Sequence, residues 1–264
     1  MKTPITYYGG KATLAQKIVE RFPPDYQNMT YAEIFLGGGS VFFEKEPSRL
    51  EILNDTNREL INFFSVIQND FTSLEKEVRI SLHSRSLHND AKAIYHNPHL
   101  FSPLKRAWAI WVLANQGFSG MVGRTWGYDK AKPTMSRKLL GKRETFTEQY
   151  AIRLQNVSLE CTDALKLIRN RDSGNTLFYV DPPYYNSDMG HYDGYTLEDY
   201  EELLKTLSSI QGKFILSSYP SAILEKYTKQ FNWNTESFRM TVAVQNLSGK
   251  PKKQKVEVLT RNYQ

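Results

Sequence analysis

Apolar residues follow two patterns along this chain. Short apolar runs have the length and composition of buried strands, and they lie at 31–35, 50–53, 156–160, 176–180 and 213–218. Between them, apolar residues recur at helical spacing over 60–67 and 197–210, which predicts amphipathic helices. Thr196 directly precedes the second of these helices and Asp199 follows three residues later, a pattern typical of a capped helix start. Alternating strands and helices predict an α/β fold.

The middle of the chain breaks this alternation. Residues 69–155 are mostly helical in pattern and rich in loops, with an apolar helix around Trp108 and Trp111. We therefore expect 1–68 and 156–264 to form one α/β domain, into which 69–155 is inserted. At 264 residues and 40% hydrophobic content, the chain is long enough for one large core with a smaller appended domain.

The tetrapeptide Asp181, Pro182, Pro183, Tyr184 directly follows the predicted strand at 176–180. Ligands bind at the carboxyl ends of strands in an open α/β sheet, so we expect this motif to face a ligand. An exocyclic amine on a nucleic-acid base is a poor nucleophile, because its lone pair is delocalised into the ring. The Asp181 carboxylate and the Pro182 carbonyl can each accept one amine hydrogen and draw the nitrogen towards tetrahedral geometry, with Tyr184 stacked on the base. The alternative is a strand that runs into a polyproline turn.

A run of three glycines, 37–39, separates the predicted strand at 31–35 from the apolar residues 41–43. This pattern predicts a strand, a turn and a helix. Glycines let the backbone approach a ligand closely and leave the amides at the helix start free, which suits a nucleotide or an amino-acid carboxylate. The Gly-Gly-Lys at 9–11 lacks the earlier glycine and the final Ser or Thr of a phosphate loop, which argues against NTP hydrolysis.

Asp55 closes the second predicted strand and precedes the helical pattern at 60–67. An acid at this place is suited to accept hydrogen bonds from ribose hydroxyls. Capping the N-terminus of the following helix is an equally common role for Asp and Asn. Both alternatives stay open on the local sequence.

The formal net charge of +6 suits a polyanionic partner, and its distribution favours one segment. Between 120 and 143, a single acid, Asp129, faces seven basic residues: Arg124, Lys130, Lys132, Arg137, Lys138, Lys142 and Arg143. Within this segment or directly before it lie the aromatic residues Phe118, Trp126 and Tyr128 and the glycines Gly117, Gly120, Gly123 and Gly127. A basic and aromatic loop of this kind fits contact with DNA phosphates and bases, whereas a basic run alone is usually a solvated face. A second basic cluster comprises Lys250, Lys252, Lys253 and Lys255.

The cysteine and histidine residues indicate whether the chain has disulfides or a metal site. The single cysteine, Cys161, excludes an internal disulfide and fits a reducing cytoplasm. The five histidines form no zinc pattern with it, so we expect no metal. The first residues carry no apolar signal region, and no run reaches the length of a membrane span.

Four motifs together resemble the Dam family of DNA adenine methyltransferases, which use S-adenosylmethionine to methylate the N6 amine of adenine. In the family's order they are Tyr-Tyr-Gly-Gly-Lys at 7–11, Glu-Ile-Phe-Leu-Gly-Gly-Gly-Ser at 33–40, Asn-Asp at 54–55, and Asp-Pro-Pro-Tyr at 181–184. The resemblance covers most of the chain. It implies a Rossmann-like methyltransferase sheet with helices on both faces, a closing strand at 255–263, and a mainly helical target-recognition domain inserted at 69–155.

The resemblance also implies roles for individual residues. For S-adenosylmethionine it implies Tyr7, Lys11, Glu33, Phe35, Gly37, Gly38, Gly39, Asp55, Asp163 and Asp181. Asp163 could equally cap the helix that follows it. The target adenine is assigned to Asp181, Pro182, Pro183 and Tyr184. DNA contacts are assigned to Phe118, Ser119, Arg124, Trp126, Lys130, Lys132, Arg137 and Lys138. Ser119 stands where the family usually has Asn, so a GATC target is not assumed.

We therefore expect a site-specific DNA methyltransferase that flips an adenine out of the duplex. Methylation of cytosine N4 poses the same chemical problem, and Asp181 favours adenine by resemblance. A catalytically silent DNA-binding regulator is the alternative from another class, and the intact motif at 181–184 argues against it. The expected partner is double-stranded DNA, with a restriction endonuclease as a candidate counterpart. We expect a monomer without metal or membrane contact, in the cytoplasm of a bacterial or phage-infected cell.

Overall fold

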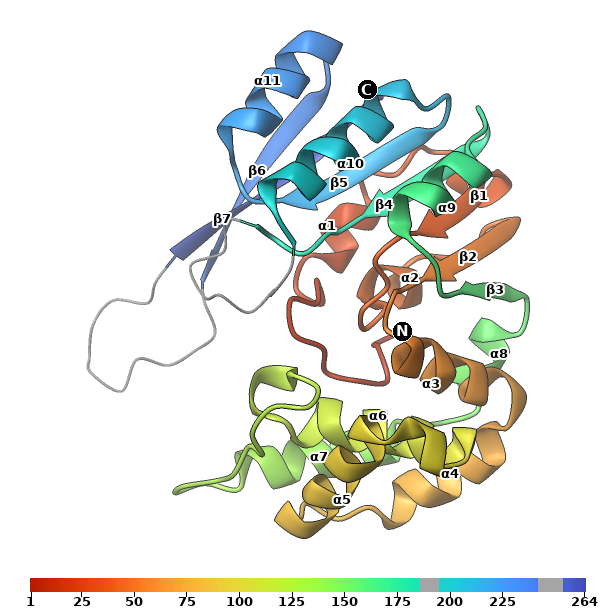
Figure 1. Ribbon diagram of the computed structural model, residues 1–264, viewed down its shortest axis with the longest axis vertical. Coiled ribbons are helices and arrows are strands. Elements are labelled where there is room, and N and C mark those ends of the chain that lie inside the picture. The colour runs from red at the N-terminus through yellow and green to blue at the C-terminus, as the bar shows by residue number, and fades with distance from the viewer. Residues whose placement is uncertain (186–194, 242–253) are drawn as a thin grey trace. The chain divides into compact units, whose positions relative to one another are not determined.

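The computed structural model describes residues 1–185, 195–241 and 254–264. Within these residues, seven strands form one sheet in the order β3-β2-β1-β4-β5-β7-β6 (Figure 1). The strands are β1 (Thr30–Glu33), β2 (Leu50–Asn54), β3 (Val157–Glu160), β4 (Thr176–Val180), β5 (Lys213–Ser218), β6 (Asn234–Thr241) and β7 (Gln254–Arg261). All five apolar runs predicted as strands are confirmed, and β7 is the predicted closing strand.

Strand direction identifies the functional edge of the sheet. The pairs β1/β4, β2/β3 and β4/β5 are parallel, whereas β7 is antiparallel to both β5 and β6. The order runs through β2 and β3 on one side and through β5 on the other, so it reverses between β1 and β4. In open α/β sheets, ligands bind beyond the carboxyl ends of the strands at such a reversal. The fold is therefore mixed α/β with a Rossmann-like sheet, as predicted.

The described chain divides into two compact units. Unit 1 contains Met1–Arg21 and Leu36–Thr162, and unit 2 contains Phe22–Phe35 and Asp163–Gln264. These boundaries differ from the predicted limits of the insertion at 69–155, because the helices of that segment pack onto helix α3 (Arg58–Asn69), which precedes it. The functional division into a cofactor domain and a recognition domain stays a prediction.

Unit 1 is mainly helical. Besides β2, β3 and α3 it holds α1 (Ala15–Val19), α2 (Ser40–Glu44), α4 (Phe71–Ile80), α5 (Arg85–His96), α6 (Pro103–Gln116), α7 (Thr134–Glu144) and α8 (Gln149–Leu154). Short 3₁₀ turns lie at η2 (Pro98–Leu100) and η3 (Phe118–Gly120). The predicted tryptophan helix is α6, which contacts α3, α4, α5 and α7 and is buried from Ala107 to Gln116. Helix α6 lies among these four helices, which bury its residues from Ala107 to Gln116 (Figure 1).

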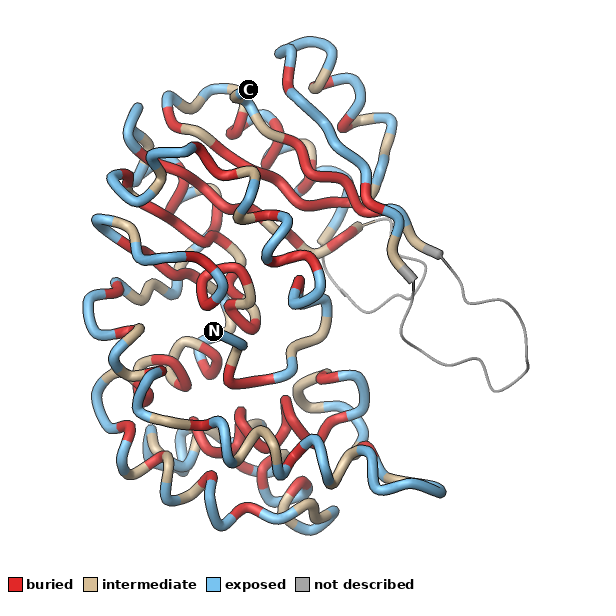
Figure 2. The backbone as a smooth tube through the Cα atoms, turned by 180° about the vertical axis from the view of Figure 1, so that it is seen from behind, coloured by how far each residue is buried: buried red, intermediate tan, exposed pale blue. Residues whose placement is uncertain are grey.

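Unit 2 holds the other five strands with η1 (Tyr26–Asn28), α9 (Ala164–Arg171), α10 (Leu197–Ser209) and α11 (Ala222–Phe231). Every residue of β4 is buried, and β5 is buried after its first residue (Figure 2). Helix α10 contacts both α9 and α11. It begins with the predicted capping box, in which the Thr196 hydroxyl accepts from Asp199 N and the Asp199 carboxylate accepts from Thr196 N.

The described ranges lack two features that other function classes require. None of their helices has the length and hydropathy that a membrane span requires. No three or more His, Cys, Asp or Glu side chains in these ranges are grouped to hold a metal ion.

Candidate functional site

The glycine turn of unit 1 follows β1 and leads into α2, as predicted. Gly37 and Gly39 have φ of 50° and 69°, in the left-handed region that side chains other than glycine rarely adopt. Gly38 is held differently, because a Cβ there would lie 2.9 Å from the Cβ of Tyr7. The turn is therefore packed directly against the Tyr7 side chain, and any substitution with a side chain would separate the two.

Asp55 joins this turn to the start of α3. Its carboxylate accepts hydrogen bonds from Gly37 N and from Asn57 N, each at 2.9 Å. The N-cap of α3 is Asn57, whose side chain accepts from Glu59 N and Leu60 N, so the alternative that Asp55 caps this helix is wrong. Burial raises the pKa of Asp55 and outweighs the two backbone hydrogen bonds, which lower it. Asp55 is thus a desolvated acceptor beside the glycine turn.

Tyr7 lies in the same cluster. Burial raises its pKa well above the usual range, and the nearby Asp55 and Tyr95 raise it further. Lys11, also predicted for the cofactor, is 7% exposed and donates to Gly9 O at 3.0 Å. Unit 1 therefore brings Tyr7, the glycine turn and Asp55 together, with the Lys11 ammonium bonded to a backbone carbonyl.

The remaining predicted cofactor residues lie in unit 2. Glu33, at the end of β1, is buried and accepts from the Tyr31 hydroxyl at 2.7 Å. Phe35 follows it and is half-buried. Asp163 is exposed and caps α9 by accepting from Lys166 N at 2.8 Å, so the cap alternative is confirmed. A cofactor role for these three residues stays a prediction.

The motif at 181–184 begins directly after β4, next to the reversal in strand order. Asp181 and Pro183 are half-buried, whereas Pro182 and Tyr184 are buried. Burial raises the pKa of Tyr179, and Asp181, Glu33 and Glu257 raise it further, because three carboxylates lie near its hydroxyl. Unit 2 thus gathers negative charge at the carboxyl end of β4.

Tyr184 is held in a hydrogen-bond network that the sequence did not reveal. Its hydroxyl lies 2.7 Å from Glu257 Oε2, 3.2 Å from Asp181 Oδ1 and 3.3 Å from Ser217 Oγ. Its ring centroid is 4.4 Å from that of Tyr219. Stacking of Tyr184 on a base stays a prediction. The available signal for Glu257 was an acid placed between Val256 and Val258 in the predicted closing strand, where alternate side chains point to opposite faces.

The predicted recognition segment in unit 1 forms a short loop after α6. Gly117 and Trp126 form a bridge, and Phe118 N donates to Thr125 O at 2.8 Å. Ser119 has φ of 57°, and the neighbouring Phe118 is 55% exposed. Trp126 is stacked on His83 with a centroid distance of 4.7 Å. The loop therefore presents Phe118 and Ser119 on a braced support.

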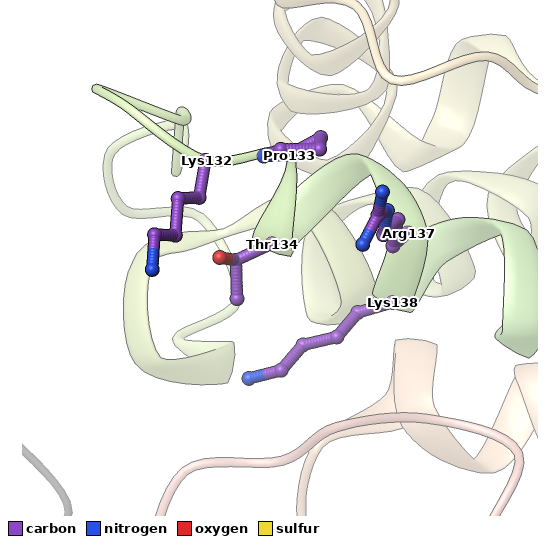
Figure 3. A pocket seen from close by; sticks show the side chains of 5 residues that line it. All are labelled: Lys132, Pro133, Thr134, Arg137 and Lys138. Carbon is purple, nitrogen blue, oxygen red and sulfur yellow. The ribbon is translucent and has the colours of Figure 1, made fainter.

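Exposed basic residues surround the start of α7. All five that were predicted to contact DNA are exposed: Arg124, Lys130, Lys132, Arg137 and Lys138. Three of them, Lys132, Arg137 and Lys138, line a surface cavity of about 400 Å³ together with Pro133 and Thr134 (Figure 3). The cavity is lined by positive charge and by no acid, which suits a phosphate oxygen.

Other charges of the basic segment have structural partners. Asp129 accepts from Thr134 N, Met135 N and Ser136 N at the start of α7, and the Met135 hydrogen bond is the largest cause of its lowered pKa. Lys142 donates to Thr3 O, and Arg143 donates to Arg79 O. In the second cluster, Lys255 donates to Glu257, and Lys250, Lys252 and Lys253 lie outside the described residues.

Comparison with known proteins identifies the family. The model of the D12 class N6 adenine-specific DNA methyltransferases matches residues 7–242. The Type II methyltransferase M1.LlaDCHI of Lactococcus lactis subsp. cremoris is 25% identical over 283 residues, which cover 97% of this chain and 93% of that protein.

Two solved structures are also similar in fold, with low scores. The rRNA methyltransferase AviRa from Streptomyces viridochromogenes has a TM-score of 0.43 and 13% identity, covering 97% of this chain and 87% of that chain. The precorrin-6y C5,15-methyltransferase from Geobacter metallireducens GS-15 has a TM-score of 0.40 and 11% identity, covering 95% and 85%. Similarity at these TM-scores supports no conclusion about this chain. The match over 7–242 does: the chain belongs to the D12 class of N6 adenine-specific DNA methyltransferases.

Proposed function

We propose that the protein transfers the methyl group of S-adenosylmethionine to the N6 amine of an adenine flipped out of duplex DNA. One observation carries the proposal: Asp181 to Tyr184 directly follow β4, at the reversal of strand order, in a chain of an adenine-specific family. Ligands bind at this edge of open α/β sheets. The acid and the proline carbonyl that an amine requires are consecutive residues there.

The residues of unit 1 fit S-adenosylmethionine. The turn at 37–39 carries no side chains, so a ligand can approach its backbone closely. Asp55 is a desolvated carboxylate beside that turn and suits the ribose hydroxyls. We assign Tyr7 and Lys11 to the same ligand. When bound, this cofactor supplies a methyl group on a positively charged sulfonium.

Acidic residues of unit 2 complete the proposed cofactor set. Glu33 is a buried carboxylate at the end of β1, and Asp163 follows β3 at the start of α9. We assign both to the cofactor, together with Phe35 and the carboxylate of Asp181. The buried carboxylate of Glu33 suits a cationic ligand, because opposite charges attract more strongly where water is excluded.

The adenine amine is activated by two acceptors. Asp181 and the Pro182 carbonyl each take a hydrogen bond from the amine, which localises the nitrogen lone pair and aims it at the methyl carbon. A bound cofactor would supply the methyl group, with the nitrogen–carbon bond forming as the sulfur–carbon bond breaks. The nitrogen then carries a fourth substituent and becomes acidic, so its proton passes to water or to Asp181 without a strong base.

The segment 69–155 is proposed as the target-recognition domain, with 1–68 and 156–264 as the catalytic domain. The exposed basic residues around α7 grip the phosphates, and this contact fixes the position of the duplex without reading its sequence. Phe118 and Ser119 at the loop tip, with Trp126 behind them, contact the bases around the extruded adenine.

The proposed reaction is tested by its product. Purified protein is incubated with unmethylated duplex DNA and S-adenosylmethionine, and the DNA is digested to nucleosides and analysed by mass spectrometry. We expect N6-methyldeoxyadenosine that depends on the cofactor. N4-methyldeoxycytidine instead, or no modified nucleoside, would contradict the proposal. Modified-base sequencing of the same DNA identifies the recognised site.

Replacement of the acid tests its role. We expect Asp181→Ala to lower the methylation rate at least about 100-fold, because one of the two acceptors that activate the amine is removed. The affinity for DNA, measured by fluorescence anisotropy, stays unchanged. Asp25→Ala removes an exposed carboxylate from the same unit and serves as the control. Asp181→Ala activity within about twofold of the wild type would refute the assignment.

A further inference from the structure

We propose that Glu257 is a positioning residue, which fixes the orientation of Asp181 through the hydroxyl of Tyr184. The inference rests on the proposed function, since it gives Glu257 a part in the activation of the adenine amine. All the residues that carry it belong to unit 2: the segment directly after β4 supplies Asp181 and Tyr184, β5 supplies Ser217, and β7 supplies Glu257 and Lys255.

The Glu257 carboxylate is held at both oxygens. It is 1% exposed, its Oε1 accepts from Lys255 Nζ at 2.7 Å, and its Oε2 accepts from the Tyr184 hydroxyl at 2.7 Å. Lys255 is about one third exposed, so the ion pair connects a buried acid to the surface. A buried carboxylate with two short charge-assisted bonds has little freedom to move. The Glu257 carboxylate is therefore held in one position next to the Tyr184 hydroxyl.

The Tyr184 hydroxyl connects the Glu257 carboxylate to the Asp181 carboxylate. The same hydroxyl that lies 2.7 Å from Glu257 lies 3.2 Å from Asp181 Oδ1. Burial raises the pKa of Tyr184 far above its usual range, and Asp181 and Glu257 raise it further, so the phenol keeps its proton. A phenol has one proton to donate, and the nearer acceptor takes it. Glu257 thus decides where the Tyr184 hydroxyl points.

The position of the Tyr184 hydroxyl affects the chemistry because it touches Asp181. Ser217 approaches the hydroxyl from β5 at 3.3 Å and restricts it on a third side. If Glu257 is removed, the hydroxyl can turn towards Asp181 and bond to the carboxylate that the amine needs. A misplacement of about 1 Å in such a site costs roughly 100-fold in rate. The predicted defect is in the chemical step and leaves DNA binding intact.

A double-mutant cycle tests this path. We expect Glu257→Gln and Tyr184→Phe each to lower kcat about 10- to 100-fold, with KM for DNA changed less than about twofold. If Glu257 acts through the hydroxyl, the double variant is no slower than the slower single variant. Independent losses that multiply in the double variant, or a Glu257→Gln enzyme with wild-type kcat, would overturn the inference. Glu202→Gln removes a carboxylate from an exposed ion pair with Lys205 and is the matched control.

Lys255→Gln provides a second test, which removes the ion-pair partner of Glu257 and leaves the Glu257 side chain in place. We expect a three- to tenfold loss in kcat that disappears in the Tyr184→Phe background. A Lys255 that merely contacted DNA would instead change KM and its salt dependence, and that result would count against the inference. Thermal melting of every variant shows whether the fold is kept. If Glu257→Gln fails to fold, the Lys255→Gln and Tyr184→Phe pair decides the question.

Base extrusion gives a readout apart from methylation. In a duplex that carries 2-aminopurine at the target adenine, fluorescence rises when the base leaves the stack. We expect Glu257→Gln to keep the wild-type fluorescence change, and loss of that change would contradict a role confined to the chemical step. A wild-type enzyme that makes no N6-methyladenine would refute the proposed function. Equal rates of N6-methyladenine formation by the wild type and by Glu257→Gln would refute only the role of Glu257.

Discussion

At the scale of single residues, His88 has an unusual environment. It lies in α5 of unit 1 and is 1% exposed, and neither ring nitrogen has a hydrogen-bond partner among the described residues. Burial lowers its pKa, and the nearby Lys92 and Arg85 lower it further. The folded protein therefore holds His88 neutral, whereas the unfolded chain binds a proton near pH 6.5.

This environment makes the free energy of unfolding depend on pH. Below about pH 6.5 the unfolded chain binds more protons at this residue than the folded one, so stability falls as the pH falls. We expect His88→Leu to be more stable by about 1 kcal/mol at pH 7.5, because two unsatisfied polar atoms are removed. The difference grows at pH 5.5. Urea unfolding at the two pH values measures it, with the exposed His99→Leu as control. Parallel pH curves for His88→Leu and the wild type would show that His88 does not titrate as described.

Two acids show what local sequence can and cannot decide. Asp55 and Asp163 each follow a strand and precede a helix, and each was open to a cap or a ligand role. In the structure Asp163 caps its helix and Asp55 does not. The Asp55 carboxylate instead accepts a hydrogen bond from Gly37 N, in a turn 18 residues earlier. Because that contact joins distant parts of the chain, neither the motif nor its spacing predicts it. The role of Glu257 was hidden for the same reason.

At the scale of elements, prediction succeeded where burial leaves a pattern. Strands β4 and β5 and helix α6 are buried along most of their length, and their apolar runs predicted them. Strand β6 was not predicted, because it lies at the edge of the sheet and Phe238 is its only buried residue among 234–240. Helix α7 was missed too, since Leu139 is its only buried side chain. When few residues of a strand or helix are buried, its apolar residues do not recur at a regular spacing, and the sequence pattern does not identify the element.

The N-terminal segment 3–8 connects two functional elements of unit 1. Its Thr6 N donates to Asn115 Oδ1 of α6 at 3.0 Å, and its Tyr8 N donates to Gly120 O of η3 at 3.2 Å. Between them, the Tyr7 side chain packs against the glycine turn. The proposed recognition loop and the proposed cofactor turn therefore share one short segment of backbone.

This connection predicts a remote effect on cofactor affinity. We expect Asn115→Ala to weaken S-adenosylmethionine binding three- to tenfold in isothermal titration, because Thr6 loses its acceptor and Tyr7 is held less firmly. Asn115 belongs to α6 and not to the glycine turn. Asn62→Ala, which removes an exposed side-chain bond to Pro103 O, is the control. Unchanged affinity for the cofactor in Asn115→Ala, with the fold intact, would show that segment 3–8 transmits nothing.

At the scale of the whole molecule, the net charge of +6 matters through its distribution. Lys142 and Arg143 belong to the basic segment in sequence, yet each donates to a backbone carbonyl. Burial and the nearby Lys2 lower the pKa of Lys142 to about 8, so part of this charge is lost above neutral pH. The exposed residues around α7 therefore supply the positive field of this segment, and a sum over the sequence overstates it.

The salt dependence of the affinity for DNA should show which basic side chains contact phosphates. Each phosphate contact adds about 0.9 to the slope of the logarithm of affinity against the logarithm of salt concentration. We expect Lys132→Ala with Lys138→Ala to lower that slope by about 2 and to leave cofactor affinity unchanged. Lys226→Ala with Lys229→Ala removes the same charge from the exposed face of α11 and is the matched control. Equal slopes for the two double variants would mean that net charge alone attracts DNA, and the surface around α7 would then have no special role in gripping the duplex.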